Sequence, residues 1–247
     1  MEKKNAIDFL LYSYFGVTTD SDWEKCVEAA IMKAYNDATM QGAYNALISK
    51  DDDKLHEASK NAKNEAARHL YDKINELFNT ENKDFGNWHS ELCNEIKNKY
   101  SDVNSENTLF TYGNAQKWVN MTIKYICILG LLNDNNDYQD KINNYMDDFH
   151  VPVDSYIIDK LWGNPNIKLP SISSNVKREK TYTTPSDYVI SWSNWTDKNY
   201  GDFREKLDKT YNLQWECKAW IEQAKIRKQN DKQAKWDSFF KEKNSQE

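Results

Sequence analysis

The sequence predicts an all-α fold, with residues 1–247 forming a single multi-helix domain. Glycine and proline are scarce, at 7 and 4 residues, where an average composition would give about 17 and 12. Sheet-rich folds need glycine in their turns. The chain contains neither the GxGxxG nor the GxxxxGK[ST] motif of nucleotide-binding loops. Because apolar residues recur at helical spacing, we expect roughly nine to eleven helices.

Four helices are predicted in the first hundred residues. The second follows a capping box formed by Ser21 and Glu24, a pattern in which two side chains satisfy free amides of the first turn. The third follows an acidic lead at residues 51–53. The predicted ranges are about 6–15, 23–35, 53–77 and 87–99. A polar connector over residues 100–110 leads to the second half of the chain.

The second half opens with a helix over residues 115–132 that is apolar on nearly every face, which predicts that it is buried. A short apolar helix is expected between Asp154 and Gly163. Residues 163–185 carry three of the four prolines and predict an extended crossover loop. The predicted C-terminal helices, within residues 185–240, cover about 197–211 and 214–240.

The uneven distribution of charge bears on partners. The chain has a net charge of −6, which argues against nucleic-acid binding by the chain as a whole, because phosphate contacts dominate that affinity. Residues 133–159 alone hold seven Asp and one Lys, a net charge of −6. The sequence therefore leaves open a protein partner that binds this acidic segment. Residues 218–247, in contrast, carry a net positive charge.

Cysteine spacing and hydropathy bear on the compartment. The four cysteines include no CxxC pair, which is typical of reduced thiols in a cytoplasmic protein. The longest apolar run, residues 118–132, contains Asn120 and Lys124 and is too short to cross a bilayer. The four histidines lack HExxH spacing. We therefore expect a cytoplasmic protein without a metal, a cofactor or a membrane contact.

One polar stripe interrupts the apolar helix over residues 115–132. Lys117, Asn120 and Lys124 lie at positions i, i+3 and i+7 and share one face. The stripe has two interpretations. It faces solvent while the rest of the helix is core, or it lines a cleft in which a partly desolvated lysine loses its proton more easily and acts as a nucleophile. The small-residue turn Tyr112–Gln116 precedes the helix, and the amides of such a turn can bind a phosphate.

Two motifs in this region resemble those of the helix-hairpin-helix DNA glycosylases. The pattern Gly113-x-Ala115-x-Lys117-x-x-Asn120 is similar to the hairpin motif of that superfamily. The segment Val151-Pro152-Val153-Asp154, continuing to Leu161-Trp162-Gly163, is similar to its second motif. The two motifs occur in the family's order and cover about residues 109–163. The resemblance implies a helix-hairpin-helix core over about 103–163.

The resemblance also implies roles for particular residues. Lys117 would attack C1′ of a flipped nucleotide, and Asp154 would assist it. Backbone amides would bind a DNA phosphate at Gly113, Asn114, Ala115 and Gln116. The side chains expected to line the cleft are Tyr112, Asn120, Lys124 and Trp162. An Asp directly before an apolar helical run is also a standard N-cap, and this second interpretation of Asp154 is compatible with the first.

The function implied is DNA base excision by a glycosylase and AP lyase, acting on a damaged or modified base through a lysine Schiff base. An oxidised purine is the substrate that family analogy suggests. Two alternatives stay open from the sequence. One is a non-catalytic helical module that retains the hairpin fold and binds DNA or a protein, and the other is a helical module of a bacterial or phage conflict system.

Overall fold

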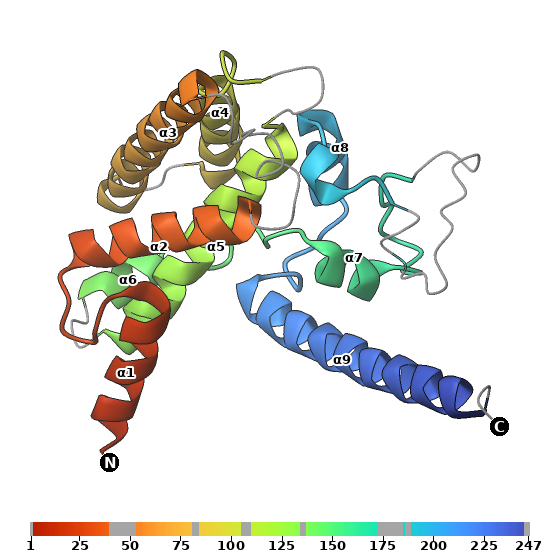
Figure 1. Cartoon of the computed structure of the whole chain (residues 1–247). Coiled ribbons are helices and arrows are strands. Elements are labelled where there is room, and N and C mark those ends of the chain that lie inside the picture. The colour runs from red at the N-terminus through yellow and green to blue at the C-terminus, as the bar shows by residue number, and fades with distance from the viewer. Residues whose placement is uncertain are drawn as a thin grey trace.

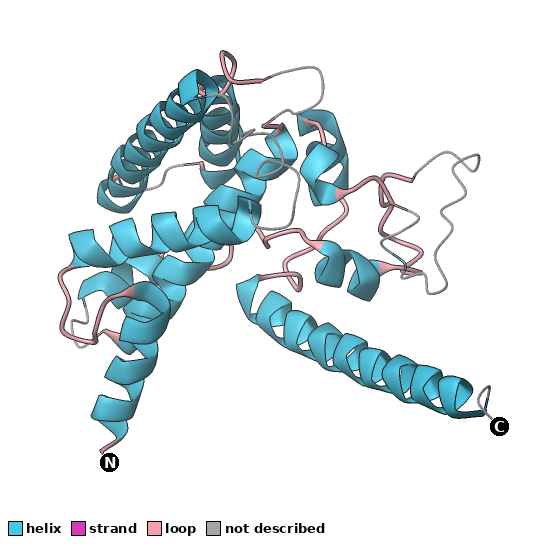
Figure 2. Cartoon of the chain, in the orientation of Figure 1, coloured by secondary structure: helices cyan, strands magenta, loops and turns pink. Residues whose placement is uncertain are grey.

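The computed structural model describes residues 2–39, 53–80, 84–104, 110–133, 137–171, 185 and 189–244. Within these residues the chain forms nine α-helices and one short 3-10 helix, η2, and it forms no strand (Figure 2). The all-α expectation is therefore confirmed. The helices are α1 (Lys3–Phe15), α2 (Trp23–Thr39), α3 (Asp53–Asn79), α4 (Phe85–Asn98), α5 (Tyr112–Leu132), α6 (Asp137–Asn143), α7 (Ser155–Leu161), η2 (Trp192–Asn194), α8 (Asp197–Arg204) and α9 (Leu213–Asn244).

Helix α5 lies at the centre of the molecule, with α2 crossing it and α4, α6, η2 and α8 packed around it (Figure 1). Its residues are buried almost without interruption from Tyr112 to Gly130, as the apolar sequence on every face predicts. The indole N–H of Trp118, which is fully buried, donates to the carbonyl of Ile31 at 2.9 Å and so ties α5 to α2. Every face of this helix is thus in contact with another element or with the site described below.

The start of α5 differs from the sequence expectation. The helix begins at Tyr112 rather than at 115, because Thr111 and Asn114 form a reciprocal capping box. The residues expected to form a turn before the helix are therefore its first turn. Gly113 is needed there for a close approach, since a Cβ at this position would lie 2.0 Å from the carbonyl oxygen of Trp192.

Other boundaries also differ from the expectation. Helix α8 ends at Arg204, short of the predicted 211, and a separate short helix, α6, forms inside the acidic segment. Helices α4 and α5 pack on each other across the connector of residues 99–111. Parts of five predicted segments lie outside the described residues: 51–52 of the acidic lead, 105–109 of the connector, 134–136 of the acidic segment, 172–184 of the crossover loop and 186–188 of the C-terminal range.

Helix α9 packs its first half against α7 and then extends away from the other helices (Figure 1). Arg227 links the two helices, because its guanidinium donates to Asp159 at 3.1 and 2.5 Å and to the Ser155 hydroxyl at 3.0 Å. A second ion pair joins Lys160 of α7 to Glu222 of α9 at 2.8 Å. These contacts fix the beginning of α9 beside α5 and α7, where the polar stripe of α5 lies.

Candidate functional site

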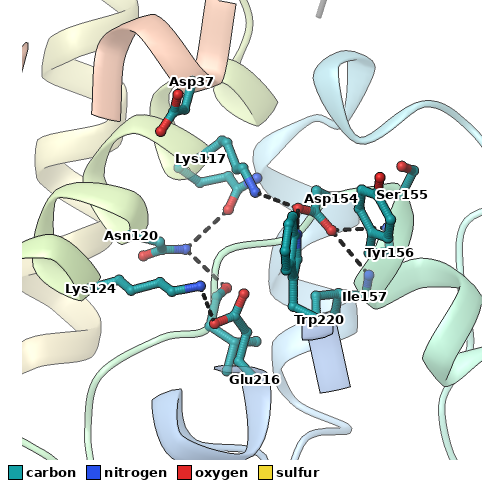
Figure 3. Close-up of polar contacts among 12 residues, drawn as sticks. Asp37, Lys117, Asn120, Lys124, Asp154, Ser155, Tyr156, Ile157, Glu216 and Trp220 are labelled. Carbon is teal, nitrogen blue, oxygen red and sulfur yellow. Dashed lines mark hydrogen bonds and ion pairs between the residues drawn. The ribbon is translucent and has the colours of Figure 1, made fainter. Parts of the chain in front are cut away.

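The polar stripe of α5 does not face solvent. Lys117 and Asn120 are buried, with exposed fractions of 4% and 1%. Lys124 is half-buried and points toward the beginning of α9 (Figure 3). Because lysine is almost never buried without a partner, each of the two lysine amines must have an anionic neighbour. The structure supplies one carboxylate for each.

Lys117 and Asp154 form the central contact of the site. The Nζ atom of Lys117 donates to Oδ2 of Asp154 at 3.0 Å (Figure 3). The Lys117 amine also lies 5.8 Å from the ring centroid of Trp192, within the range of a cation–π contact. The fold therefore brings together the two residues for which the sequence resemblance implies a joint role.

Asp154 is both an N-cap and an ion-pair partner. Its Oδ1 accepts hydrogen bonds from the amides of Tyr156 and Ile157 at the start of α7, at 2.9 and 3.0 Å. Its Oδ2 accepts from Lys117 and from the indole N–H of Trp220, at 3.0 and 3.1 Å. Burial alone would raise the pKa of Asp154, but the charge of Lys117 and these hydrogen bonds outweigh burial and hold the pKa below its usual value. The carboxylate is therefore ionised at neutral pH.

The ion pair lies on the wall of a cleft of about 340 Å³ between α5, α7, α9 and η2, which also reaches α1 and α2. This volume is at the lower end of the range for small-molecule sites. The lining residues are charged or aromatic for the most part: Tyr14, Asp37, Lys117, Met121, Lys124, Tyr125, Asp154, Ser155, Tyr156, Trp192, Glu216 and Trp220. A cleft of this composition suits a planar polar group better than an aliphatic one.

Lys124 and Glu216 form a second ion pair in the same cleft. Nζ of Lys124 lies 2.6 Å from Oε2 of Glu216 (Figure 3). The Glu216 residue is fully buried, and its carboxylate also forms a hydrogen bond with the Cys217 side chain. Burial raises the pKa of Glu216, and the charges of Lys124 and Lys117 offset part of that rise. The two ion pairs therefore act on each other as one group of four charges.

Asn120, the middle residue of the stripe, is turned into the core rather than into the cleft. Its amide nitrogen donates to Gln116 Oε1, the Val151 carbonyl and the Tyr200 hydroxyl, within 2.9 to 3.3 Å. Its carbonyl oxygen lies 2.8 Å from Nε2 of His89. The residue therefore organises buried polar groups and does not line the cleft.

The histidine beside Asn120 belongs to a buried pair. The rings of His89 and His150 lie 4.4 Å apart, and Nδ1 of His150 is 3.1 Å from the Tyr200 hydroxyl. Burial lowers the pKa of His89 to about 3 and lowers the pKa of His150 well below its usual value. Both rings are therefore neutral at physiological pH.

The amides for which the resemblance implies phosphate binding have partners within the protein. The Gly113 amide donates to the Trp195 carbonyl at 2.9 Å. The Asn114 amide donates to the Thr111 hydroxyl at 3.2 Å, and the Ala115 amide donates to the Thr111 carbonyl at 3.1 Å. Gln116 is fully buried. The amides of Gly113, Asn114 and Ala115 are therefore already paired with acceptors of the protein itself.

Two further residues expected at the cleft lie elsewhere. Tyr112 is buried in the core, where its ring contacts Tyr200 at 5.8 Å between centroids. Trp162 lies at the C-terminal end of α7 and is 46% exposed. Of the site residues predicted from the sequence, Lys117, Asp154 and Lys124 line the cleft.

Sequence reasoning missed two of the residues that complete the cleft. Glu216 and Trp220 lie at positions i and i+4 of α9, so both are far along the chain from the lysines of α5. The only signal for Glu216 was the two lysines of the α5 stripe, because a buried amine requires an acid that the stripe itself does not contain. Nothing in the sequence specified which of the many acidic residues would supply it.

Comparison of the chain with protein-family models, curated proteins and solved structures found no match. In the described part of the chain, no helix combines the length and apolar character needed to cross a bilayer. Nor do the described residues contain a group of three or more His, Cys, Asp or Glu side chains arranged to hold a metal ion. Function is therefore inferred from the geometry of the cleft and from the two sequence motifs.

Proposed function

We propose that the cleft between α5, α7 and α9 is the active site of a DNA base-excision glycosylase and AP lyase. It acts on a flipped damaged or modified base through a lysine Schiff base. The observation that carries the proposal is the Lys117–Asp154 contact of 3.0 Å on the wall of an open cleft with aromatic sides. An oxidised purine as substrate rests on the family resemblance alone.

Lys117 supplies the nucleophile in this proposal. The Lys117 ammonium first releases a proton to solvent, and its neutral Nζ then forms a bond to C1′ of the flipped nucleotide while the bond from C1′ to the base nitrogen breaks. The base leaves with that electron pair and takes up a proton. Loss of the amine protons and opening of the C1′–O4′ bond then give an imine, which water or β-elimination resolves. Asp154, ionised because its pKa is low, stabilises the positive charge that develops on the sugar as the base leaves.

Contacts to the DNA backbone come from lysines in this proposal, because the first-turn amides of α5 have protein partners. Lys225, Lys228 and Lys232 are exposed on α9 at positions i, i+3 and i+7, which gives one positive stripe. This stripe begins next to the α7–α9 contact that borders the cleft. A row of lysines supplies sequence-independent affinity for phosphates.

A non-catalytic module that binds DNA or a protein is the second candidate. It is favoured by the same pairing, since both cleft lysines already have a carboxylate partner. In that case the ion pairs serve to hold α5 against α7 and α9. The acidic segment retains exposed acids for a protein partner, although Asp154 and Asp159 are taken up by contacts to α5 and α9.

Borohydride trapping separates the two candidates. The protein is mixed with duplex DNA that carries an abasic site or 8-oxoguanine, and borohydride reduces any imine to a stable covalent complex. We expect the wild type and the control Lys198→Ala, which changes an exposed lysine of α8, to be trapped. Lys117→Ala should not be trapped. Equal trapping of Lys117→Ala, or no trapping of the wild type, would contradict the enzymatic proposal.

A further inference from the structure

Trp220 is the contact between helix α9 and the Lys117–Asp154 pair. Its indole N–H donates to Oδ2 of Asp154 at 3.1 Å, and the same oxygen accepts from Lys117 at 3.0 Å (Figure 3). Oδ1 accepts from the amides of Tyr156 and Ile157. A carboxylate has about four acceptor positions, so these donors use all of them. The orientation of Asp154 is therefore fixed from α5, α7 and α9 at once.

The indole of Trp220 is itself held in place. Its ring centroid lies 5.0 Å from that of Tyr156, and the Arg227 guanidinium lies 4.0 Å from the Tyr156 ring centroid. Arg227 is in turn bound to Asp159 of α7. A donor whose ring is already fixed by packing loses little conformational freedom when it forms a hydrogen bond. The N–H of Trp220 is therefore preorganised toward the Asp154 carboxylate.

The proposed reaction makes this hydrogen bond most important when Lys117 moves. In the resting protein the Lys117 ammonium also holds Oδ2 of Asp154. Once the amine has released a proton and turned to C1′, it no longer donates to that oxygen. Positive charge develops on the sugar at the same stage, and the carboxylate has to stay ionised and in position to stabilise it. Among the described residues, the donors that remain on Asp154 are Trp220 and the two α7 amides.

We propose that Trp220 is a positioning residue, whose indole N–H keeps the Asp154 carboxylate in its orientation while Lys117 leaves that carboxylate to attack the sugar. Trp220 acts through Asp154 and not on the reacting atoms. The inference rests on the proposed excision function for the reaction that Trp220 serves, whereas the hydrogen bond from Trp220 to Asp154 can be tested without any reaction.

The first test separates the chemical step from DNA binding. Trp220→Phe keeps an aromatic ring beside Tyr156 and removes the N–H donor. We expect the single-turnover rate of borohydride trapping at saturating 8-oxoguanine duplex to fall by about tenfold or more, because a hydrogen bond to a charged group is lost. The dissociation constant for the same duplex, measured by fluorescence anisotropy, should stay within about twofold of the wild type, since the bond acts on the transition state.

A matched control is available on the same helix. Trp215→Phe makes the same change at a tryptophan that packs on Tyr211 and does not line the cleft. It should keep both the trapping rate and the dissociation constant of the wild type. A purely structural role of Trp220 would lower stability or DNA affinity without a selective loss of rate.

The second test measures the hydrogen bond itself. Hydrogen exchange of the Trp220 indole proton is followed by heteronuclear NMR in the wild type and in Asp154→Asn. The oxygen of the new Asn has to face the α7 amides to cap that helix, so its amide nitrogen faces Trp220 and cannot accept. We expect exchange of the Trp220 indole proton to be about tenfold or more faster in Asp154→Asn. Exchange of the Trp215 indole proton should be unchanged.

Two results would overturn the proposal: a trapping rate of Trp220→Phe equal to that of the wild type, or indole exchange that does not respond to Asp154→Asn. The exchange comparison decides the matter where Trp220→Phe does not fold. Absence of trapping by the wild type would remove the excision function instead. Faster exchange in Asp154→Asn would in that case still support Trp220 as the residue that orients Asp154.

Discussion

Lys117 and Asp154 are 37 positions apart in the chain, and their side chains meet at 3.0 Å on the wall of the cleft. Lys117 comes from the second turn of the buried helix α5, and Asp154 comes from the N-cap of α7. The same carboxylate also binds the indole of Trp220 from α9. The Asp154 side chain therefore connects three helices and sets the position of the Lys117 amine. Substitutions at Asp154 can for this reason separate its contribution as an N-cap from the contribution of its charge.

Replacing Asp154 should reveal two separable contributions. Asp154→Asn keeps a good N-cap and removes the charge, whereas Asp154→Ala removes both. We expect Asp154→Ala to lower the free energy of unfolding by about 3 kcal/mol, because the buried Lys117 amine is left without its partner and α7 loses its cap. Asp154→Asn should cost about 1 kcal/mol less than Asp154→Ala, the value of the cap. Urea unfolding at pH 7 measures both variants, and equal losses would argue against a capping role.

Gly113→Ala should be strongly destabilising. The added Cβ would lie 2.0 Å from the backbone oxygen of Trp192, and η2 cannot move away without breaking the hydrogen bond from the Gly113 amide to Trp195. We expect a loss of about 1–3 kcal/mol or more in urea unfolding. Gly201→Ala is the matched control, because its Cβ meets no atom within 4 Å, and we expect it to be neutral or stabilising by up to about 1 kcal/mol.

The buried histidine pair predicts a loss of stability in mild acid. The folded pKa of His89 is about 3, below its usual value of 6.5, so between these pH values the unfolded chain binds a proton that the folded chain does not. Stability therefore falls as pH falls through this window, by about 2 kcal/mol for His89 between pH 7 and pH 5. The pKa of Asp154 is lowered from 3.8, so its contribution is lost only at more acidic pH. The raised pKa of Glu216 acts in the opposite direction.

Two variants isolate the histidine contribution. His89→Gln, which can still hydrogen-bond to Asn120, should show a smaller decrease in the free energy of unfolding between pH 7 and pH 5. His56→Gln changes an exposed position of α3. It should show the same decrease in the free energy of unfolding between pH 7 and pH 5 as the wild type. The measurement is urea unfolding at each pH. An unchanged pH slope in His89→Gln would show that His89 is not neutral in the folded protein.

Lys124 and Glu216 should be strongly coupled in a double-mutant cycle. Lys124→Met leaves the buried Glu216 carboxylate without its counter-charge, and we expect a loss of about 3 kcal/mol at pH 7.5. The double variant Lys124→Met with Glu216→Gln should be more stable than the sum of the single losses predicts, by about 1–3 kcal/mol. Additive losses would mean that the 2.6 Å contact contributes no net stability.

The lysine stripe of α9 should govern the salt dependence of DNA binding if the proposed function holds. Lys228→Gln removes one charge from the middle of the stripe. We expect the slope of log affinity against log salt to become shallower by about 0.9 for each phosphate that the protein no longer neutralises. Lys198→Gln, on α8, should leave the slope unchanged. The measurement is fluorescence anisotropy with labelled duplex DNA over a series of salt concentrations.

Local patterns accounted for much of the fold. The periodicity of residues 53–77 predicted α3, and the apolar faces of residues 115–132 predicted a buried α5, because burial on all sides requires apolar residues on all sides. The start of α5 was misplaced because the Thr111–Asn114 capping box was not recognised, although both residues have the side-chain oxygens that such a box requires. The end of α8 was overestimated by several residues, since helical spacing alone does not locate a helix end.

The sequence by itself determined that α5 is buried, and that its two lysines need anionic partners if their stripe is turned away from solvent, since a buried amine without a counter-charge is too costly to persist. It also pointed to Asp154 as the N-cap of α7. Tertiary structure alone decided that Asp154 and Glu216 are those partners and that Asn120 turns to the histidine pair. It also decided that η2 packs against the first turn of α5. The physical reason is that these contacts join segments far apart in the chain, and no local pattern specifies which distant acid or carbonyl packing brings near.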